Sequence, residues 1–307
     1  MRGLLIVNPN ATSTSARARD VLIGALAHQF DLAVKTTEHR GHAAELGAQA
    51  RADGLDYVIV LGGDGSVNEA VNGMLADGPS GKMPILGIVP GGSANIIART
   101  LGFPNDPIEA TGELISSLRS NRTRTIGLGR ANGRWFLANC GLGVDAEIIA
   151  DMEKMRADGK EATPSRYLAT SIKRVLFGTD RKTPKLSAVI PGEPMVKGVY
   201  LAIVQNCSPW TYLGGMPVNP SPNADFDSGL DLWAIRSMSI ATSALQARRI
   251  ITKSGPGNTK NVLAKHDLES VRIICDPPTL LQVDGEGLGE VDQVEFVSVP
   301  NALTVFV

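Results

Sequence analysis

The chain has 307 residues, 43% hydrophobic and 20% charged, with a formal net charge of −1 at pH 7. These values are typical of a globular protein of about two domains, and they predict no whole-chain attraction to nucleic acid. No apolar run approaches the roughly 18 residues of a membrane span. Three widely spaced cysteines predict neither a zinc site nor a disulfide framework. We therefore expect the protein to be located in the reducing cytoplasm.

The first 125 residues alternate between short apolar runs and amphipathic stretches. The first run stops at Asn8-Pro9 and predicts a strand rather than a signal peptide. This alternation predicts an α/β domain with a doubly wound, Rossmann-like, mostly parallel sheet that helices cover on both faces. Strands are expected at 4–7, 32–36, 57–61 and 85–89, and helices at 13–30, 42–53, from 66, from 94 and at 108–118.

After Thr125, strand-like runs separated by turn residues dominate and predict a C-terminal antiparallel β-sandwich. We expect a nucleotide-binding domain at 1–128 with 296–307, and a substrate domain at 129–295. The active site is expected in the cleft between them, outside the carboxyl ends of the parallel strands. Predicted strands lie at 135–139, 185–190, 198–205, 230–235, 271–275, 280–283, 294–297 and 303–307, and helices at 146–177 and 240–252.

Two glycine-rich loops each follow a predicted strand and precede a predicted helix. They are Gly62-Gly63-Asp64-Gly65-Ser66 and Gly91-Gly92-Ser93-Ala94-Asn95. Glycines let backbone N–H groups and a helix N-terminus approach an anion closely, so the pair predicts a bound polyphosphate. Phosphate would repel Asp64 unless this aspartate faces Mg²⁺ or polarises a hydroxyl. Ser66 also starts a capping-box pattern, and Ser93 is a candidate helix N-cap.

Two further turns carry polar residues that suit a site. The turn from Asn8 to Ser13 joins the first strand to the first helix, where either helix capping or a phosphate contact fits. Asp284-Gly285-Glu286 follows a late predicted strand. It is either a hairpin turn or a source of a general base, and the sequence leaves both interpretations open.

The ordered set of motifs resembles the family of diacylglycerol kinases, sphingosine kinases and their bacterial lipid-kinase relatives. The resemblance runs nearly end to end. Its motifs are Asn8-Pro9, Thr37-Glu38 with His42-Ala43, both glycine loops with Ala98-Arg99, Gly143-Val144-Asp145-Ala146, Gly214-Gly215, Gly229-Leu230-Asp231 and Asp284-Gly285-Glu286.

This resemblance implies that the chain transfers phosphate from Mg²⁺–ATP to a lipid hydroxyl. By analogy, Asp284, Glu286 and Asp64, in that order, are candidates for the general base, and Asp64 also serves the Mg²⁺–nucleotide. Asp145 would orient the substrate head group or join the relay that activates it. The implied nucleotide-binding residues are Asn8, Pro9, Asn10, Thr12, Thr37, Gly62, Gly63, Asp64, Gly65, Ser66, Gly91, Gly92, Ser93 and Asn95.

The chain departs from the family pattern in three places. In the turn after Asn8-Pro9, where some relatives have a lysine, this chain has Thr12 and Ser13. Ile96 and Ser228 stand where some relatives have aspartates that hold a structural Mg²⁺, so that ion is left open here. The departures at these two positions keep a non-catalytic nucleotide-binding regulatory protein as an alternative. An NAD kinase is a second alternative, because it shares the first glycine loop but normally has a different second motif.

The stretch 151–185 mixes basic residues with an apolar face. A core helix with a solvated basic side explains this pattern, and so does peripheral contact with the inner face of a membrane. We expect nucleotide and lipid as partners and no nucleic acid. The sequence does not fix which lipid or alcohol is phosphorylated, and it leaves a homodimer open.

Overall fold

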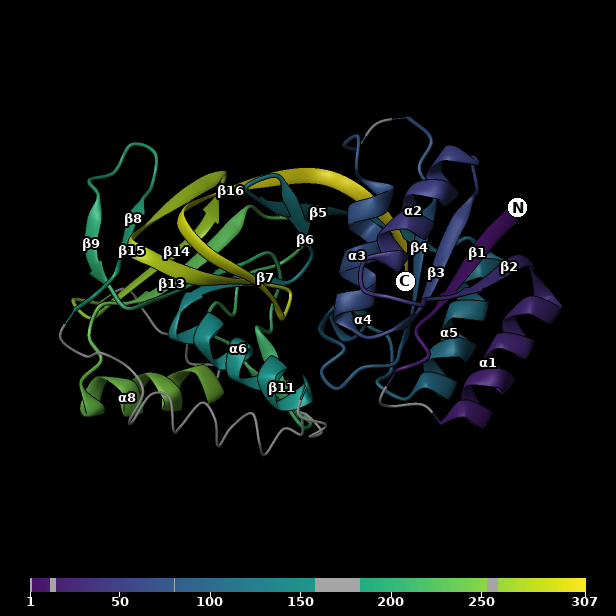
Figure 1. Cartoon of the computed structure of the whole chain (residues 1–307), viewed down its shortest axis with the longest axis horizontal. Coiled ribbons are helices and arrows are strands. Elements are labelled where there is room, and N and C mark those ends of the chain that lie inside the picture. Colours follow the sequence, from purple (N-terminus) through teal and green to yellow (C-terminus); the bar gives the residue numbers. More distant parts are fainter. Residues whose placement is uncertain (1, 12–14, 80, 158–182, 253–258) are drawn as a thin grey trace. The chain divides into compact units, whose positions relative to one another are not determined.

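The computed structural model describes residues 2–11, 15–79, 81–157, 183–252 and 259–307 (Figure 1). The chain divides into two compact units, residues 1–126 with 301–307 and residues 127–300. The first unit is a mostly parallel sheet with helices, and the second is built mainly from antiparallel strands. The predicted fold class of an α/β part followed by an antiparallel β part is therefore confirmed.

The parallel sheet of the first unit forms from four apolar segments. They are β1 (Arg2–Val7), β2 (Asp31–Thr36), β3 (Tyr57–Gly62) and β4 (Ile85–Pro90), in the spatial order β4-β3-β1-β2. All six residues of β3 are buried, as expected for a central strand covered on both faces. The C-terminal end of the chain joins this sheet, since Val305 pairs in parallel with Leu86.

Helices cover the two faces of this sheet, with α1 and α5 together on one side and α2 and α3 on the other (Figure 1). Glycines let α2 and α3 approach closely, because a Cβ at Gly47 would lie 2.3 Å from the carbonyl oxygen of Ala70. The helices are α1 (Ala16–Gln29), α2 (His42–Ala52), α3 (Asp64–Met74), α4 (Ile96–Thr100) and α5 (Pro107–Ser120).

The second unit is built on antiparallel strands in the order β14-β13-β10-β7-β15-β16. Their inward side chains form a buried core that includes Phe136, Leu232, Ile273 and Phe296. The strands are β5 (Thr123–Ala131), β6 (Arg134–Phe136), β7 (Asn139–Gly143), β8 (Leu186–Val189), β9 (Val196–Val199), β10 (Leu201–Gln205), β11 (Thr211–Leu213), β12 (Met216–Val218), β13 (Leu230–Ile235), β14 (Val262–Leu268), β15 (Ser270–Val283) and β16 (Glu286–Phe306).

Two long strands replace four predicted short ones. The expected strands at 271–275 and 280–283 are one strand, β15, and those at 294–297 and 303–307 belong to β16. Pro277 and Pro278 predict an interruption of the strand, because proline cannot donate a hydrogen bond to the neighbouring strand. In the structure the β15–β16 register shifts between Ile274 and Thr279 and the pairing then continues.

The described residues of the second unit form two helices, α6 (Val144–Ala157) and α8 (Ile240–Ile251). A second apolar cluster includes Val144 and Ile148 of α6 together with Trp233, and Ile250 of α8 packs against it. The predicted helix 146–177 is described only as far as Ala157, and most of the basic stretch 151–185 lies outside the described residues. Within the described residues, no helix has the length and apolar character needed to cross a membrane.

Candidate active site

The carboxyl ends of the parallel strands bring the predicted nucleotide residues of the first unit to one edge. The backbone N–H of Asn8 donates to the carbonyl of Leu61, and that of Thr37 donates to the carbonyl of Val7, both at 2.9 Å. Thr37 and Asn8 therefore lie beside the first glycine loop. Asn10 continues the turn, since its N–H donates to Oδ1 of Asn8. Thr12 lies outside the described residues.

The two glycine loops touch each other through their backbones. The N–H of Gly91 donates to the carbonyl of Gly62 at 2.8 Å. A Cβ at Gly92 would lie 2.8 Å from the Cα of Gly63, and a Cβ at Gly63 would lie 3.1 Å from the Cα of Gly92. Such spacing leaves no room for side chains, which explains why glycine stands at both positions. The structure therefore combines the two predicted loops into a single glycine surface.

Helix α3 begins two residues earlier than predicted, and the expected capping box is wrong. Its N-cap is Gly63, which provides no side-chain cap. Ser66 lies inside the first turn, where its Oγ accepts a hydrogen bond from Nδ2 of Asn8 at 2.8 Å. The first turn of α3 thus points N–H groups outward without a capping side chain, and this arrangement suits a phosphate group.

Asp64 connects the two loops through its carboxylate. Oδ2 accepts from the N–H of Ile96 and Oδ1 accepts from the N–H of Ile97, both at 3.1 Å. These are the first two residues of α4, so the negative charge lies at that helix's positive end. A carboxylate in this role fixes the second loop against the first, a contribution that the sequence did not reveal.

Asn95, rather than Ser93, is the N-cap of α4. Asn95 is 2% exposed and has φ 48°, in the left-handed region. Its side-chain oxygen accepts from the N–H of Gly92, and its Nδ2 donates to the carbonyl of Gly92 and to Asn105, each at 2.8 Å. The amide therefore holds the second loop in shape, while Ser93 stands exposed on that loop.

In the second unit, the Asp284-Gly285-Glu286 segment forms the tight turn between β15 and β16. Asp284 has φ 46° and is 7% exposed. Its carboxylate accepts from the N–H groups of Leu137, Ala138 and Asn139 at 2.8–2.9 Å. Asp284 therefore anchors the segment that precedes β7. The predicted hairpin turn is confirmed, and the general base stays a prediction.

Asp145 lies in the first turn of α6 and is 1% exposed. Its Oδ2 accepts from Nε2 of Gln282 at 2.8 Å, while Oδ1 has no hydrogen-bond partner among the described residues. Burial raises the pKa of Asp145 to about 6, although the Gln282 hydrogen bond opposes the shift. Gly141 permits this placement, since a Cβ there would overlap the Asp145 carboxylate.

Gln282 links Asp145 to the turn, and the sequence gave no signal for it beyond its position two residues before Asp284. Its Oε1 accepts from the N–H of Gly285 at 2.8 Å, and its Nε2 also donates to Oδ1 of Asn139 at 3.1 Å. One buried amide thus joins the predicted head-group carboxylate to the predicted general-base turn.

Glu286 forms an ion pair with Arg134 of β6, a second residue that the sequence reasoning missed. The side chains of Glu286 and Arg134 are 17% and 31% exposed, so the pair is partly accessible to solvent. Of the two turn carboxylates, Asp284 is directed at backbone N–H groups, whereas Glu286 meets a side chain near the surface. The two therefore differ in what they can do chemically.

Comparison with known proteins bears on the first unit, which carries the two glycine loops. Residues 2–131 match the family model of the diacylglycerol kinase catalytic domain. This stretch is similar to that family, and the predicted resemblance is therefore confirmed. The matched residues include both glycine loops.

Curated relatives show the same likeness over part of their length. A diacylglycerol kinase of Bacillus subtilis is 32% identical over 124 residues, and one of Staphylococcus saprophyticus is 33% identical over 138 residues. The alignments cover 40% and 44% of this chain and 39% and 43% of the two relatives. The matched stretch thus spans less than half of each relative.

Solved structures extend the likeness of fold to the whole chain. A diacylglycerol kinase from Bacillus anthracis matches with a TM-score of 0.71 at 23% identity, over 99% of this chain and 96% of that one. An NAD kinase from Archaeoglobus fulgidus in complex with ATP matches with a TM-score of 0.54 at 10% identity, over 100% and 94%. At these identities the comparison concerns the fold.

No group of three His, Cys, Asp or Glu side chains within the described part of the chain could hold a metal ion. In the first unit, both oxygens of Asp64 already accept backbone N–H groups. Mg²⁺ often keeps several waters and binds through substrate phosphates with one or two carboxylates. The residues present fit an ion that arrives with a nucleotide better than an ion held in a protein cage.

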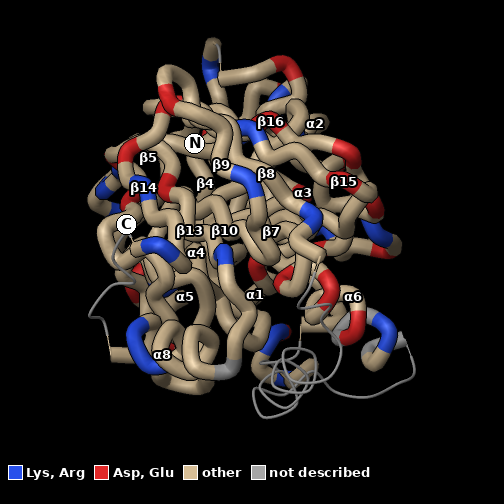
Figure 2. The backbone as a smooth tube through the Cα atoms, turned by 90° about the vertical axis from the view of Figure 1, so that its left-hand side faces the viewer, with Lys and Arg blue, Asp and Glu red and all other residues tan. Residues whose placement is uncertain are grey.

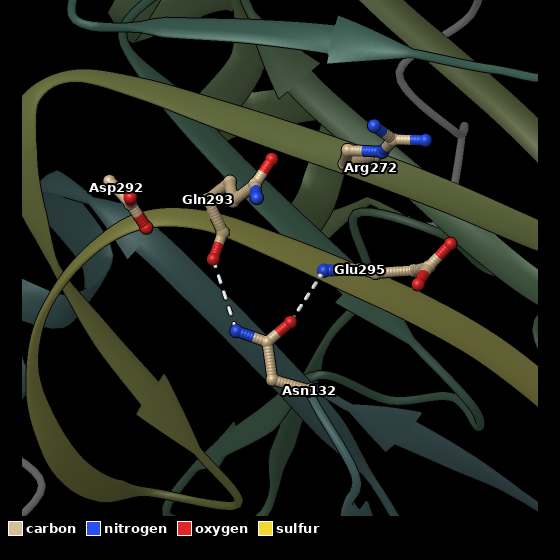
Figure 3. A pocket seen from close by; sticks show the side chains of 5 residues that line it. All are labelled: Asn132, Arg272, Asp292, Gln293 and Glu295. Carbon is tan, nitrogen blue, oxygen red and sulfur yellow. Dashed lines mark hydrogen bonds between the residues drawn. The ribbon is translucent and has the colours of Figure 1, made fainter.

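A polar depression of about 350 Å³ lies on the β15–β16 hairpin of the second unit (Figure 3). Asn132 lines it, donating from Nδ2 to the carbonyl of Gln293 and accepting at Oδ1 from the N–H of Glu295. Arg272 and Asp292 also line it. None of the predicted site residues lines this depression. The Asn132 hydrogen bonds are structural, since they hold the end of β5 against β16.

Proposed function

We propose that this protein is an ATP-dependent lipid kinase, which transfers the γ-phosphoryl group of Mg²⁺–ATP to a hydroxyl of a lipid. The observation that carries the proposal is the glycine surface formed by the two interlocked loops. It lies inside the stretch that matches the diacylglycerol kinase catalytic domain. In this reaction the lipid oxygen bonds to the γ-phosphorus, the bond to the bridging oxygen breaks, ADP leaves, and the hydroxyl proton passes to a base.

The first unit would bind the nucleotide. Gly62, Gly63, Gly91 and Gly92 would face the phosphates with backbone N–H groups, and the uncapped first turn of α3 adds its positive end. Thr37 would lie near the nucleoside. Asp64 and Asn95 would hold the loops in the required shape through the hydrogen bonds described above. A bound Mg²⁺ would neutralise part of the phosphate charge.

The second unit would bind the acceptor. A buried carboxylate oxygen without a partner is costly, and an incoming donor removes that cost. Oδ1 of Asp145 is such an oxygen. We therefore propose that Asp145 receives a hydroxyl or head-group donor of the lipid. Glu286 is the better-exposed candidate for the proton acceptor, and Asp284 would position the turn that carries it.

Transfer of labelled phosphate from γ-labelled ATP tests the proposal. The acceptor panel contains diacylglycerol, a sphingoid base, a glycolipid and NAD, each with and without Mg²⁺. Labelled lipid product that requires Mg²⁺ is the expected result. Transfer to NAD alone would make the protein an NAD kinase, and tight ATP binding without any transfer would make it a regulatory module; either result would overturn the proposal.

A further inference from the structure

Helix α8 exposes two large apolar side chains and buries two polar ones. Leu245 and Ile251 are 47% and 40% exposed, whereas Gln246 is 3% and Thr242 is 8% exposed. With 3.6 residues per turn, the exposed positions form one continuous face. That face consists of Ala241, Ala244, Leu245, Ala247, Arg248 and Ile251.

The inward polar residues are held mainly by hydrogen bonds. The side chain of Ser239 caps the helix by accepting from the N–H of Thr242, and Nδ2 of Asn261 donates to Oγ1 of Thr242. The Oε1 atom of Gln246 is buried without a partner among the described residues. Among the described side chains of this helix, Ile250 packs on the neighbouring apolar cluster. The arrangement is the reverse of an ordinary surface helix, whose apolar face is buried.

The β11–β12 hairpin lies beside the C-terminal end of α8. The N–H of Asn219, directly after β12, donates to the carbonyl of Ile250 at 2.8 Å. Met216 of the hairpin is 41% exposed. We call the outward face of α8 together with Met216 the α8 surface. The hairpin also reaches the candidate acceptor site, because the carbonyl of Trp210 accepts from Nδ2 of Asn139 at 3.0 Å.

The α8 surface contains one charged residue, Arg248. Helix α8 contains Arg248 and Arg249 but no carboxylate (Figure 2). Residues 198–224, which include the hairpin, contain no charged residue. The whole chain has 31 acidic residues in 307, so about two would be expected in these 20 helix and hairpin residues on the chain average. Apolar side chains beside arginines suit the headgroup region of an anionic bilayer.

We infer that the α8 surface docks on an anionic lipid bilayer. The inference rests on the proposed lipid kinase function, since a membrane-resident acceptor is what gives this docking its purpose. Leu245, Ile251 and Met216 enter the boundary between headgroups and acyl chains, and Arg248 meets lipid phosphates. The hairpin then connects the docked surface to Asn139 and so to the Asp145 network.

Co-sedimentation with phosphatidylcholine vesicles, with and without phosphatidylglycerol, tests this inference. The double variant Leu245→Glu/Ile251→Glu places two charges in the apolar boundary, so vesicle partition should fall about tenfold or more. The matched control is Val21→Glu/Ile108→Glu, which changes two side chains that are each 65% exposed on the first unit. The control should bind vesicles as the wild type does. Arg248→Gln should weaken binding only to vesicles that contain phosphatidylglycerol.

The outcomes separate this inference from the proposed function. Transfer to a detergent-dispersed short-chain diacylglycerol should persist in the double variant, because α8 holds none of the proposed site residues. Vesicle binding does not require turnover, so an inactive protein would refute the lipid kinase and leave the docking measurable. Unchanged vesicle binding by the double variant would overturn the inference. So would a dimer of the wild type that the double variant dissolves in sedimentation velocity, since a second copy would then cover α8.

Discussion

The pH dependence of stability should reveal the buried carboxylate of Asp145. Burial raises its pKa from 3.8 to about 6 in the folded protein. The folded state therefore holds this proton more tightly than the unfolded state does. As a result, the stability that Asp145 contributes is fully present below about pH 4 and is lost as the pH rises through about 6. The shift of 6 − 3.8 = 2.2 pH units corresponds to about 3 kcal/mol.

The variant Asp145→Asn should lack this loss. Its amide oxygen can still accept from Gln282, and its other costs do not depend on pH in this range. Between pH 4 and pH 7.5, the free energy of unfolding should therefore fall by about 3 kcal/mol more in the wild type than in the variant. Other titrating groups are common to both proteins, so their contributions cancel in this difference.

Urea denaturation followed by tryptophan fluorescence measures the unfolding free energy of the second unit, which contains Asp145. All three tryptophans, Trp135, Trp210 and Trp233, lie in residues 127–300. Asp292→Asn, which changes an exposed carboxylate of the same unit, serves as a control and should follow the wild type. Parallel pH profiles for the wild type and Asp145→Asn would refute the reasoning, because they would show that no proton is held there on folding.

Three further predictions concern the proposed reaction. Gly63→Val should weaken ATP binding by roughly tenfold or more, because its Cβ would lie 3.1 Å from the Cα of Gly92. Gly112→Ala in α5, where no atom lies within 4 Å of the added Cβ, is the control and should bind ATP as the wild type does in equilibrium titration. Glu286→Gln should lower kcat by about 10²–10⁴-fold without loss of thermal stability, and a variant with full turnover would exclude this carboxylate as the base. Asp284→Asn removes one of the two carboxylate oxygens that accept from three backbone N–H groups. It should therefore reduce the unfolding free energy of residues 127–300 by about 1–3 kcal/mol in the fluorescence assay. Unchanged stability would contradict the anchoring role.

The sequence by itself determined the strands of the first unit and the location of its glycine loops. Apolar runs such as 57–61, alternating with amphipathic stretches, are typical of parallel strands covered on both faces by helices. Parallel strands place their carboxyl ends at one edge, so Asn8, Thr37 and both loops had to meet there. Glycine was the readable signal, since two backbones in contact leave no room for side chains.

Only the tertiary structure decided what the carboxylates do. Asp64 pairs with N–H groups 32 and 33 residues away, and Asp284 pairs with N–H groups 145 to 147 residues away. The Asp145–Gln282 contact joins residues 137 positions apart. Local propensity and spacing carry no information about such pairs, because their geometry follows from how whole strands and helices pack. The outward apolar face of α8 is of the same kind. The sequence predicts the helix, but the elements packed against α8 determine which of its sides faces the core.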